Sequence, residues 1–380
     1  MKIEIVAIGN EILSGHTINS NSAFIANKLA EKGYDIHRQS VFPDDEKELE
    51  KGLKDSLENS DIVICTGGLG PTFDDITKKV VAKIYNLNSD DQEMEKKGVL
   101  TLKNEVGTAP GFIFKNHSTL IVLPGVPLEM KNMFEKQVLL YLEKNFPCAE
   151  SYSDHINLCM ISETKVDPVI KKFLNKNKDV QVGIYPKFGT LQIRFSVKEK
   201  KEKLDELKNI LIREFRDNIF PSKNGSLAEA IHEALIKENK TLIVSESCTG
   251  GAIATQFTSL SGSSNYFLGS MVTYSNLMKT TVLNVSSKTL KDKGAVSKEV
   301  AIQMAEGAKK ISSADYSIST TGIAGPSGGS KEKPVGTVWV GVSSDKSSDA
   351  YLFHFKKDRL ANIEFSVNYA LSILWQEINK

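Results

Sequence analysis

Residues 241–251 read TLIVSESCTGG and are followed by AIATQFTSL at residues 252–260. The first stretch is apolar and β-branched, which predicts a buried strand that ends at Ser245–Glu246, and the second stretch predicts a helix. Two glycines between them allow the backbone to turn tightly and to approach a ligand. A strand, a glycine turn and a helix in this order form the repeating unit of an α/β domain.

Ser247 lies on this turn, at the C-terminal end of the predicted strand. Ligand sites of α/β sheets form at such strand ends, and the N–H groups of a helix start can stabilise an oxyanion. We therefore expect Ser247 to be a nucleophile, and Thr249, Gly250 and Gly251 to bind substrate through their backbone. Cys248 is a rival nucleophile because a thiol is intrinsically more reactive than a hydroxyl.

A serine nucleophile needs a base, and histidine is the usual one. His232 falls on an amphipathic helix and His354 falls within the strand YLFHF, so both patterns predict structural roles. Lysine can act instead where burial lowers its pKa. The segment GSMVTYSNLMK (269–279) supplies Lys279 after a predicted strand and a polar turn, with Tyr274 in the same turn. An ordinary surface lysine is the alternative on spacing alone.

A third segment, DYSISTTGIAGPSGG (315–329), leads from a predicted strand through Thr321 and Gly322 into a loop that contains Gly325. Loops rich in glycine and proline offer N–H groups to phosphate or carboxylate, although a long surface turn is the alternative. Three such loops after three strands predict one site at the C-terminal edge of a sheet.

The N-terminal part of the chain follows the same plan. KIEIVAIG (2–9), DIVIC (61–65) and the start of TLIVLPGVPLEM (119–130) predict buried strands. Residues 20–32 predict a helix that ends at Gly33. Strands that alternate with helices indicate a second α/β layered domain, which we expect to end near residue 150.

The middle of the chain has a different pattern. An apolar segment at 155–161 and a helix at 166–175 are followed by two alternating strands and a charged helix, which predicts a small α+β domain. Residues 217–226, DNIFPSKNGS, have the composition of a linker. Ser226 and Glu229 then form a capping box that opens the next helix. From there to Lys380 we expect strands that alternate with helices again.

The composition limits the class of protein. The chain has 380 residues, 40% of them hydrophobic, with a formal net charge of +1. This length predicts two or three domains, and this charge gives no field that favours nucleic acid or an anionic membrane. Four cysteines without CxxC spacing indicate neither a zinc site nor a disulfide framework. Without a signal-peptide pattern or a spanning apolar run, we expect a cytoplasmic protein.

Four C-terminal segments, ESCTGG, VTYSNLMK, GAVSKEVAIQMAEGAK and TGIAGPSGGSKEKPVGTV, resemble in their order the C-terminal domain of the CinA family, also called PncC. The resemblance implies nicotinamide mononucleotide deamidase activity, with no metal or cofactor. It implies Ser247 as the nucleophile in preference to Cys248, and Lys279 as the base. Tyr274 and Thr321 are similar to the family's assisting residues. Arg359, in FKKDRLANIEF, resembles a late arginine that could hold the substrate phosphate, with a surface charge as the alternative.

The N-terminal segments GNEILSG, NSNSAFIANKL, TGGLGPTFDDIT, VGTAPG and LPGVPLEM resemble the family's molybdopterin-binding-like domain, which is similar to MoaB and MogA. This resemblance implies a ligand site formed by Glu11, Gly67, Gly68, Asp74 and Asp75, with Asp75 as a Mg²⁺ ligand. Helix capping is the alternative for the aspartates. The site would hydrolyse ADP-ribose, or would only bind a nucleotide or a pterin. Residues 85–104 are shorter than the family pattern and lack its Asn-rich, Gln-Ala stretch.

The expected fold class is therefore α/β, with two three-layer αβα domains joined by a small α+β KH-type domain. The expected boundaries are 1–150, 151–222 and 223–380. The middle segment lacks a GxxG loop, which disfavours nucleic-acid binding. We expect a homodimer that takes small-molecule nucleotides. A non-catalytic role in competence or DNA-damage responses is the remaining alternative.

Overall fold

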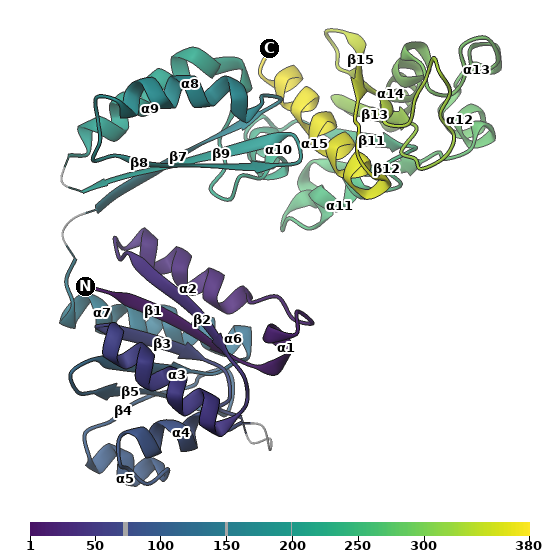
Figure 1. The fold of residues 1–380 in the computed structure, drawn as a ribbon. Helices are drawn as coiled ribbons and strands as arrows, with labels where there is room; N and C mark the ends of the chain where they lie inside the picture. The colour runs from purple at the N-terminus through teal and green to yellow at the C-terminus, as the bar shows by residue number, and fades with distance from the viewer. Residues whose placement is uncertain (71–74, 149–150, 199) are drawn as a thin grey trace. The chain divides into compact units, whose positions relative to one another are not determined.

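The computed structural model describes residues 1–70, 75–148, 151–198 and 200–380. These residues divide into two compact units, 1–152 and 153–380, and each unit is described by itself (Figure 1). The units hold three sheets with helices packed on them, which confirms the expected α/β class. Asp74, one of the predicted ligand-site residues, lies outside the described residues, and the KH-type nature of the middle segment stays a prediction.

The sheet of unit 1–152 has its strands in the order β2-β1-β3-β6-β5-β4. The first four strands run parallel and the last two run antiparallel to their neighbours. Their bounds are β1 Ile3–Ile8, β2 Ile36–Phe42, β3 Ile62–Thr66, β4 Leu100–Leu102, β5 Gly111–Lys115 and β6 Thr119–Leu123. The three apolar segments of the sequence are thus the three central strands, with bounds shifted by one residue or more.

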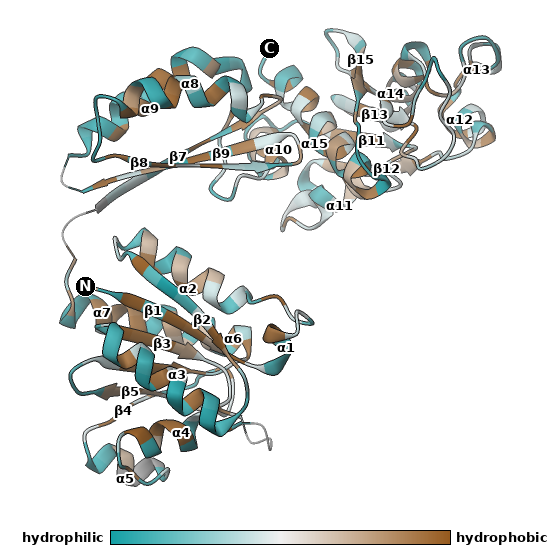
Figure 2. Cartoon of the chain, viewed as in Figure 1, coloured by the Kyte–Doolittle hydropathy of each residue, from teal (hydrophilic) through white to brown (hydrophobic). Residues whose placement is uncertain are grey.

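Side chains alternate along these strands between two separate cores, as the period of two of a strand requires. Ile3 and Ile5 face one core, whereas Val6 and Ile8 face the other. Figure 2 shows β1 and β3 as hydrophobic strands between helices that turn hydrophilic faces outward. The first core is covered by α2 Ser20–Glu31, α6 Pro127–Met133 and α7 Leu139–Asn145; the second is covered by α3 Glu46–Asn59 and α4 Thr77–Ile84.

Unit 153–380 contains two sheets. The smaller sheet has the order β10-β7-β9-β8 and carries α8 and α9 on one face (Figure 1). The element bounds are β7 Ser151–Cys159, α8 Glu163–Leu174, β8 Gln181–Lys187, β9 Thr190–Lys198, α9 Glu202–Phe215 and β10 Ile219–Phe220. The linker predicted at 217–226 is therefore wrong in its first half. Phe220 is buried, so this segment pairs with β7 as a strand instead of crossing solvent.

The larger sheet has the order β12-β11-β13-β14-β15. Its bounds are β11 Leu242–Glu246, β12 Phe267–Val272, β13 Tyr316–Gly322, β14 Thr337–Ser343 and β15 Ser348–His354. The first three strands are parallel, so their carboxyl ends meet at one edge. The sequence led us to expect strand–helix alternation up to the last residue, but β13, β14 and β15 follow one another without a helix and pair antiparallel.

Helices cover both faces of this sheet, which makes three layers. The helices α10 Leu227–Glu238, α11 Ala252–Thr258 and α15 Arg359–Ile378 share a core with one face, and α12 Asn276–Leu283, α13 Ser287–Lys293 and α14 Lys298–Ser312 cover the other. The first core also contains Cys159 and Phe220 from the smaller sheet. Trp375 of α15 donates a hydrogen bond of 2.9 Å to the carbonyl of Ile219. The two sheets of this unit therefore share one hydrophobic core.

Among the described residues of unit 1–152, two further α-helices are short, α1 Asn10–Leu13 and α5 Asp91–Lys96, and a π-helical turn, Phe134–Val138, connects α6 to α7. Together with β4, α5 is the structure that forms in the shortened segment 85–104. Among the described residues, no helix is both long enough and apolar enough to cross a membrane.

Candidate active site

Ser247 follows β11 directly, and its N–H still donates to the carbonyl of Thr320 at 3.0 Å, which keeps it in line with the sheet. After Cys248 and Thr249 the chain reaches Gly250 and Gly251, which have φ values of 62° and 103°. These positive values are open to glycine at no steric cost, so the chain reverses here and enters α11. Ser247 is almost completely buried here, with 7% of its surface exposed.

Lys279 lies on α12 and is buried, with 1% of its surface exposed. Its Nζ lies 2.8 Å from Ser247 Oγ, 2.8 Å from the carbonyl oxygen of Thr273 and 3.1 Å from that of Tyr274. Burial lowers its pKa to about 8, because desolvation disfavours the ammonium form. Among the described residues, no carboxylate forms an ion pair with it.

The three contacts of Lys279 suit a neutral amine. An NH₂ group has two hydrogens and one lone pair. The two carbonyl oxygens can only accept, so they take the hydrogens. The lone pair is then left for the hydroxyl of Ser247, which is the arrangement that a general base requires.

A cavity of about 180 Å³ opens above this pair. Its walls come from the carboxyl ends of β11, β12 and β13, as the rule for α/β sheets predicts. The lining residues are Ser247, Cys248, Tyr274, Lys279, Ala295, Val296, Thr321, Gly322, Ala324 and Arg359. The structure therefore brings six of the predicted site residues to one cavity.

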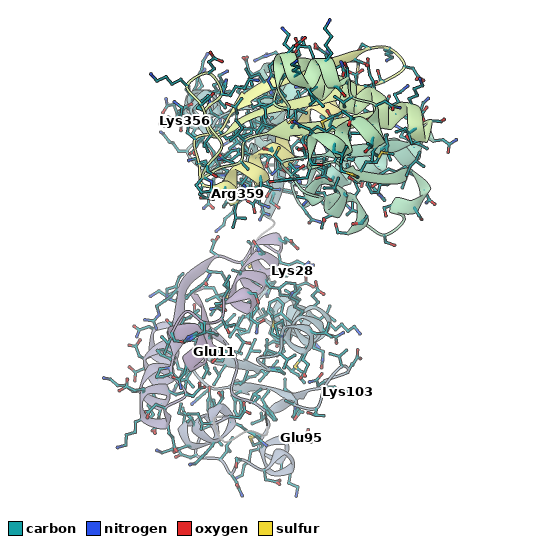
Figure 3. The ribbon with its side chains drawn as sticks, turned by 90° about the vertical axis from the view of Figure 1, so that its right-hand side faces the viewer. Glu11, Lys28, Glu95, Lys103, Lys356 and Arg359 are labelled. Carbon is teal, nitrogen blue, oxygen red and sulfur yellow. The ribbon has the colours of Figure 1, made fainter. Side chains whose placement is uncertain are left out.

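The predicted assisting residues differ in their surroundings. Thr321 is buried, and its hydroxyl donates to the carbonyl of Ala295 at 2.8 Å. Tyr274 is 63% exposed at the rim of the cavity. Arg359, labelled in Figure 3 at the start of α15, donates from Nη1 to the carbonyl of Gly325 at 2.6 Å and from Nη2 to the Tyr274 hydroxyl at 3.5 Å. Arg359 thus joins α15 to two of the three loops.

The backbone of the nucleophile turn differs from the expectation at both glycines. The N–H of Gly250 donates to the carbonyl of Ser247, and the N–H of Gly251 donates to Glu246 Oε2 at 2.9 Å. Neither group is left to hold an oxyanion. Within the described residues, the N–H groups of Cys248 and Thr249 donate to no other residue, so they are the donors that the turn leaves open.

The rival catalytic groups occupy structural positions. Burial raises the pKa of the Cys248 thiol to about 12, so it is a neutral thiol near pH 7. His232 Nδ1 lies 3.3 Å from the hydroxyl of Tyr266, and His354 Nδ1 lies 3.3 Å from Thr337 Oγ1. Neither histidine lines the cavity.

A second cavity, of about 410 Å³, lies in unit 1–152. Of the residues predicted there, Glu11 (labelled in Figure 3), Gly67, Gly68 and Asp75 line it. Gly67 has a φ of 114°, and a Cβ at this position would collide with the carbonyl of Ile8, so the loop requires glycine. No described residue of the shortened segment 85–104 reaches the cavity.

Other polar residues line this second cavity as well, among them Asn21, Asp44 and Glu129, which no sequence motif singles out. Asn21 is 9% exposed, and its Nδ2 donates to Thr66 Oγ1 at 3.0 Å and to the carbonyl of Gly125 at 2.8 Å. Because a carbonyl can only accept, this contact fixes which end of the amide is the nitrogen. Oδ1 has no hydrogen-bond partner in the described part of the chain. NSNSAFIANKL was the available signal, but it does not show which asparagine faces the ligand.

The carboxylates around this cavity fit Mg²⁺ only together with a ligand. Within the described ranges, no three His, Cys, Asp or Glu side chains are grouped as a metal site. Asp44 already accepts from the N–H of Asn10, and Glu129 accepts from Asn104. Mg²⁺ is commonly held by one or two carboxylates, water and substrate phosphates. Glu11 and Asp75 could supply such carboxylates beside a phosphorylated ligand.

Comparison with known proteins also divides the chain into an N-terminal and a C-terminal part. The family described as CinA C-terminal domain matches residues 224–378, and the family described as probable molybdopterin binding domain matches residues 4–144. A competence-damage inducible protein of Caldicellulosiruptor saccharolyticus is 38% identical over 100% of this chain and 99% of its own length. A CinA-like protein of Endomicrobium trichonymphae is 36% identical over the same shares.

Solved structures of smaller relatives match one part of the chain. A CinA superfamily protein from Escherichia coli is 32% identical, covers 41% of this chain and 93% of its own, and has a TM-score of 0.40. The identity along the whole chain to the two full-length relatives carries the assignment. The chain belongs to the CinA family, with a MoaB-like N-terminal domain and a CinA C-terminal domain.

Proposed function

We propose that the C-terminal domain is an amidohydrolase that converts nicotinamide mononucleotide and water to nicotinate mononucleotide and ammonia. The observation that supports this proposal most strongly is the 2.8 Å contact between Ser247 Oγ and the buried Nζ of Lys279. A lysine with a pKa of about 8 is partly neutral near pH 7.5 and can accept the serine proton. The substrate itself is inferred from family resemblance.

The reaction would proceed in two halves. Neutral Lys279 takes the Ser247 proton as Oγ attacks the carboxamide carbon, and the N–H groups of Cys248 and Thr249 are the donors available to the oxyanion. Collapse breaks the C–N bond, and Lys279 returns the proton to the departing nitrogen, which leaves as ammonia. Lys279 then takes a proton from water as the water oxygen attacks the acyl carbon. When the bond between the acyl carbon and Ser247 Oγ breaks, Lys279 returns this proton to Oγ, and the nicotinate leaves as its carboxylate. These steps need no cofactor.

Ammonia release from nicotinamide mononucleotide tests the proposal directly. We expect release by the wild type, and loss of at least about 1,000-fold in Ser247→Ala and Lys279→Ala, as when a nucleophile or its base is removed. Cys248→Ala is the matched control, because it changes the neighbouring side chain and should retain activity within about twofold. Activity that follows Cys248, or a folded wild type that releases no ammonia, contradicts the proposal. The second result would favour the non-catalytic competence or DNA-damage role.

We propose a second ligand site in unit 1–152, for a phosphorylated nucleotide or a pterin. Its support is the cavity that contains the glycine loop at Gly67–Gly68 together with Glu11 and Asp75. ADP-ribose in the presence of Mg²⁺ distinguishes the two forms of this proposal. Turnover that Asp75→Ala abolishes favours a pyrophosphatase, whereas binding without turnover favours a binding domain. No binding of ADP-ribose would leave the pterin as the candidate ligand.

A further inference from the structure

A buried carboxylate lies beside the nucleophile and takes no part in the steps described above. Glu246 is the last residue of β11, and its side chain is completely buried. Its Oε2 accepts from the N–H groups of Gly251 at 2.9 Å and Ile253 at 3.1 Å. Its Oε1 accepts from the N–H of Ala254 at 3.0 Å and from Ser270 Oγ at 3.2 Å.

These four hydrogen bonds connect three elements around Ser247. They fix the end of β11 to the start of α11 and to β12. Because the N–H of Gly251 and two N–H groups of the first turn of α11 bond to Glu246, they are not available to a ligand beside Ser247. The N–H groups of Cys248 and Thr249 are the ones left without another residue as partner, within the described part of the chain.

The backbone of Glu246 also reaches the base. Its carbonyl accepts from the N–H of Thr273 at 2.8 Å, and the carbonyl of Thr273 accepts from Lys279 Nζ at 2.8 Å. One residue is thus bonded through its side chain to the nucleophile turn and through its main chain to the residue that holds the base. Displacement of reacting groups by about 1 Å can cost on the order of 100-fold in rate.

We propose that Glu246 is a positioning residue, which holds the Ser247 turn and the support of Lys279 in register through its four side-chain hydrogen bonds. This inference rests on the proposed Ser–Lys mechanism but not on the identity of the substrate. Glutamine has the same shape, but its NH₂ group cannot accept, so Glu246→Gln breaks the contacts of one of the two oxygens. The position of Ser247 Oγ relative to Lys279 Nζ should then be disturbed. The residues that line the substrate cavity are unchanged.

The rate at which a fluorophosphonate probe labels Ser247 reports how well Lys279 activates this serine, and the measurement does not need the natural substrate. Ser247 Oγ forms a bond to phosphorus, fluoride leaves, and Lys279 takes the serine proton. We expect Glu246→Gln to slow labelling at Ser247 by on the order of 10- to 100-fold, and to lower kcat for ammonia release by a similar factor with KM within about twofold. Glu4→Gln is the matched control. Glu4 is an equally buried carboxylate of the other unit, bonded to Arg38, Ser40, Ser56 and Ser60.

The outcomes separate the two proposals. Labelling at Ser247 that slows in Glu246→Gln and not in Glu4→Gln supports the positioning role, even when nicotinamide mononucleotide is not a substrate. Three results would overturn the positioning role of Glu246. These are equal labelling rates in all three proteins, a change in KM alone, and a wild type that is not labelled. If circular dichroism shows that Glu246→Gln is unfolded, Ser270→Ala removes one donor of the same carboxylate. That variant should slow labelling several-fold, and an unchanged rate would contradict the proposal.

Discussion

The chemistry at the scale of single residues depends on how Lys279 is solvated. Its amine is surrounded by two carbonyl oxygens and one hydroxyl, with 1% of the side chain exposed. These three groups replace the water that would stabilise an ammonium, and within the described residues no carboxylate compensates the charge. The lowered pKa of Lys279 therefore has two measurable consequences, one for the rate and one for the stability of the fold.

The rate should rise with pH until Lys279 is neutral. With a pKa of about 8, we expect kcat/KM for ammonia release to increase about tenfold per pH unit below pH 7 and to level off above pH 9. The measurement is a series of initial rates between pH 6 and 9.5. A flat profile across this range, in an enzyme that stays folded, would show that another group is the base.

The stability of the fold should also rise with pH through this group. The pKa of Lys279 is about 8 in the folded protein and near the ordinary lysine value of 10.5 in the unfolded chain, so the unfolded chain binds more protons between these values. Stability therefore increases with pH across the window of 8 to 10.5, by up to roughly 3 kcal/mol. Urea unfolding of wild type and Lys279→Met at pH 7.5 and pH 10 isolates the effect. Relative to Lys279→Met, the wild type should have a larger free energy of unfolding at pH 10 than at pH 7.5. The same difference between the two proteins at both pH values would contradict the lowered pKa of Lys279.

The proximity of Ser247 and Lys279 was easier to predict from the sequence than the contacts that support them. Ser247 and Lys279 stand in recognisable segments, and the structure brings them to 2.8 Å. In the sequence, Glu246 is recognisable only as the end of a strand. Its contacts involve amides at the start of α11 and a hydroxyl of β12, which only the fold brings near. Asn21 was missed for the same reason, since its partners lie far away along the chain. Contacts of this kind leave no pattern in a single sequence.

At the scale of elements, α15 completes the candidate active site. Its first residue, Arg359, reaches the loop after β13 at Gly325 and the loop after β12 at Tyr274. Asp358 caps the helix by accepting from the N–H of Ala361 at 3.0 Å. The guanidinium is therefore held at the rim of the cavity, opposite the ends of two other elements.

Arg359 should distinguish a phosphorylated substrate from its nucleoside. We expect Arg359→Ala to raise KM for nicotinamide mononucleotide by about 10- to 100-fold, since a charged hydrogen bond contributes about 1.5–3 kcal/mol, and to leave kcat nearly unchanged. Nicotinamide riboside, which lacks the phosphate, provides the comparison, and its KM should change little. Equal losses for both compounds would mean that Arg359 only holds the two loops.

Two elements show where local patterns mislead. The strands β14 and β15 were placed in a strand–helix alternation, yet they form an antiparallel pair. The short polar turn SDKS (344–347) between them, with β-branched and aromatic residues on both sides, is a hairpin signal. The strand β10 is short and follows polar residues, so its sequence has the composition of a linker. It becomes a strand because Phe220 is buried in a core shared with α15.

The whole molecule consists of two units with separate cores, and this sets how it should unfold. The smaller sheet of residues 153–380 is joined to the larger one by a common hydrophobic core and by the Trp375–Ile219 hydrogen bond. The α/β class was predictable because the apolar strands alternate with amphipathic helices. The KH-type middle segment and the homodimer stay predictions, and so does the expectation that the protein does not bind nucleic acid.

We expect calorimetry to show two unfolding transitions, one for each unit. Phe220→Ala removes a buried ring from the shared core of unit 153–380, which should cost about 3–5 kcal/mol. Only one transition should move to lower temperature, and ammonia release should disappear with it. The matching change in the other unit is Phe112→Ala, also buried, which should shift the other transition. A shift of both transitions by either variant would show that the units are coupled.

The placement of Arg359 in α15 affects the protein during its synthesis. Ser247 is translated long before Arg359, at a rate of about 5–20 residues per second, so several seconds separate the nucleophile from the residue that closes its cavity. During this interval the ribosome carries a folded first unit and a second sheet whose apolar face still awaits α15. A nascent chain can thus have its N-terminal pocket in place while the proposed amidase site still lacks Arg359. The same interval is when the exposed strands are most open to chaperones, to proteases and to neighbouring nascent chains.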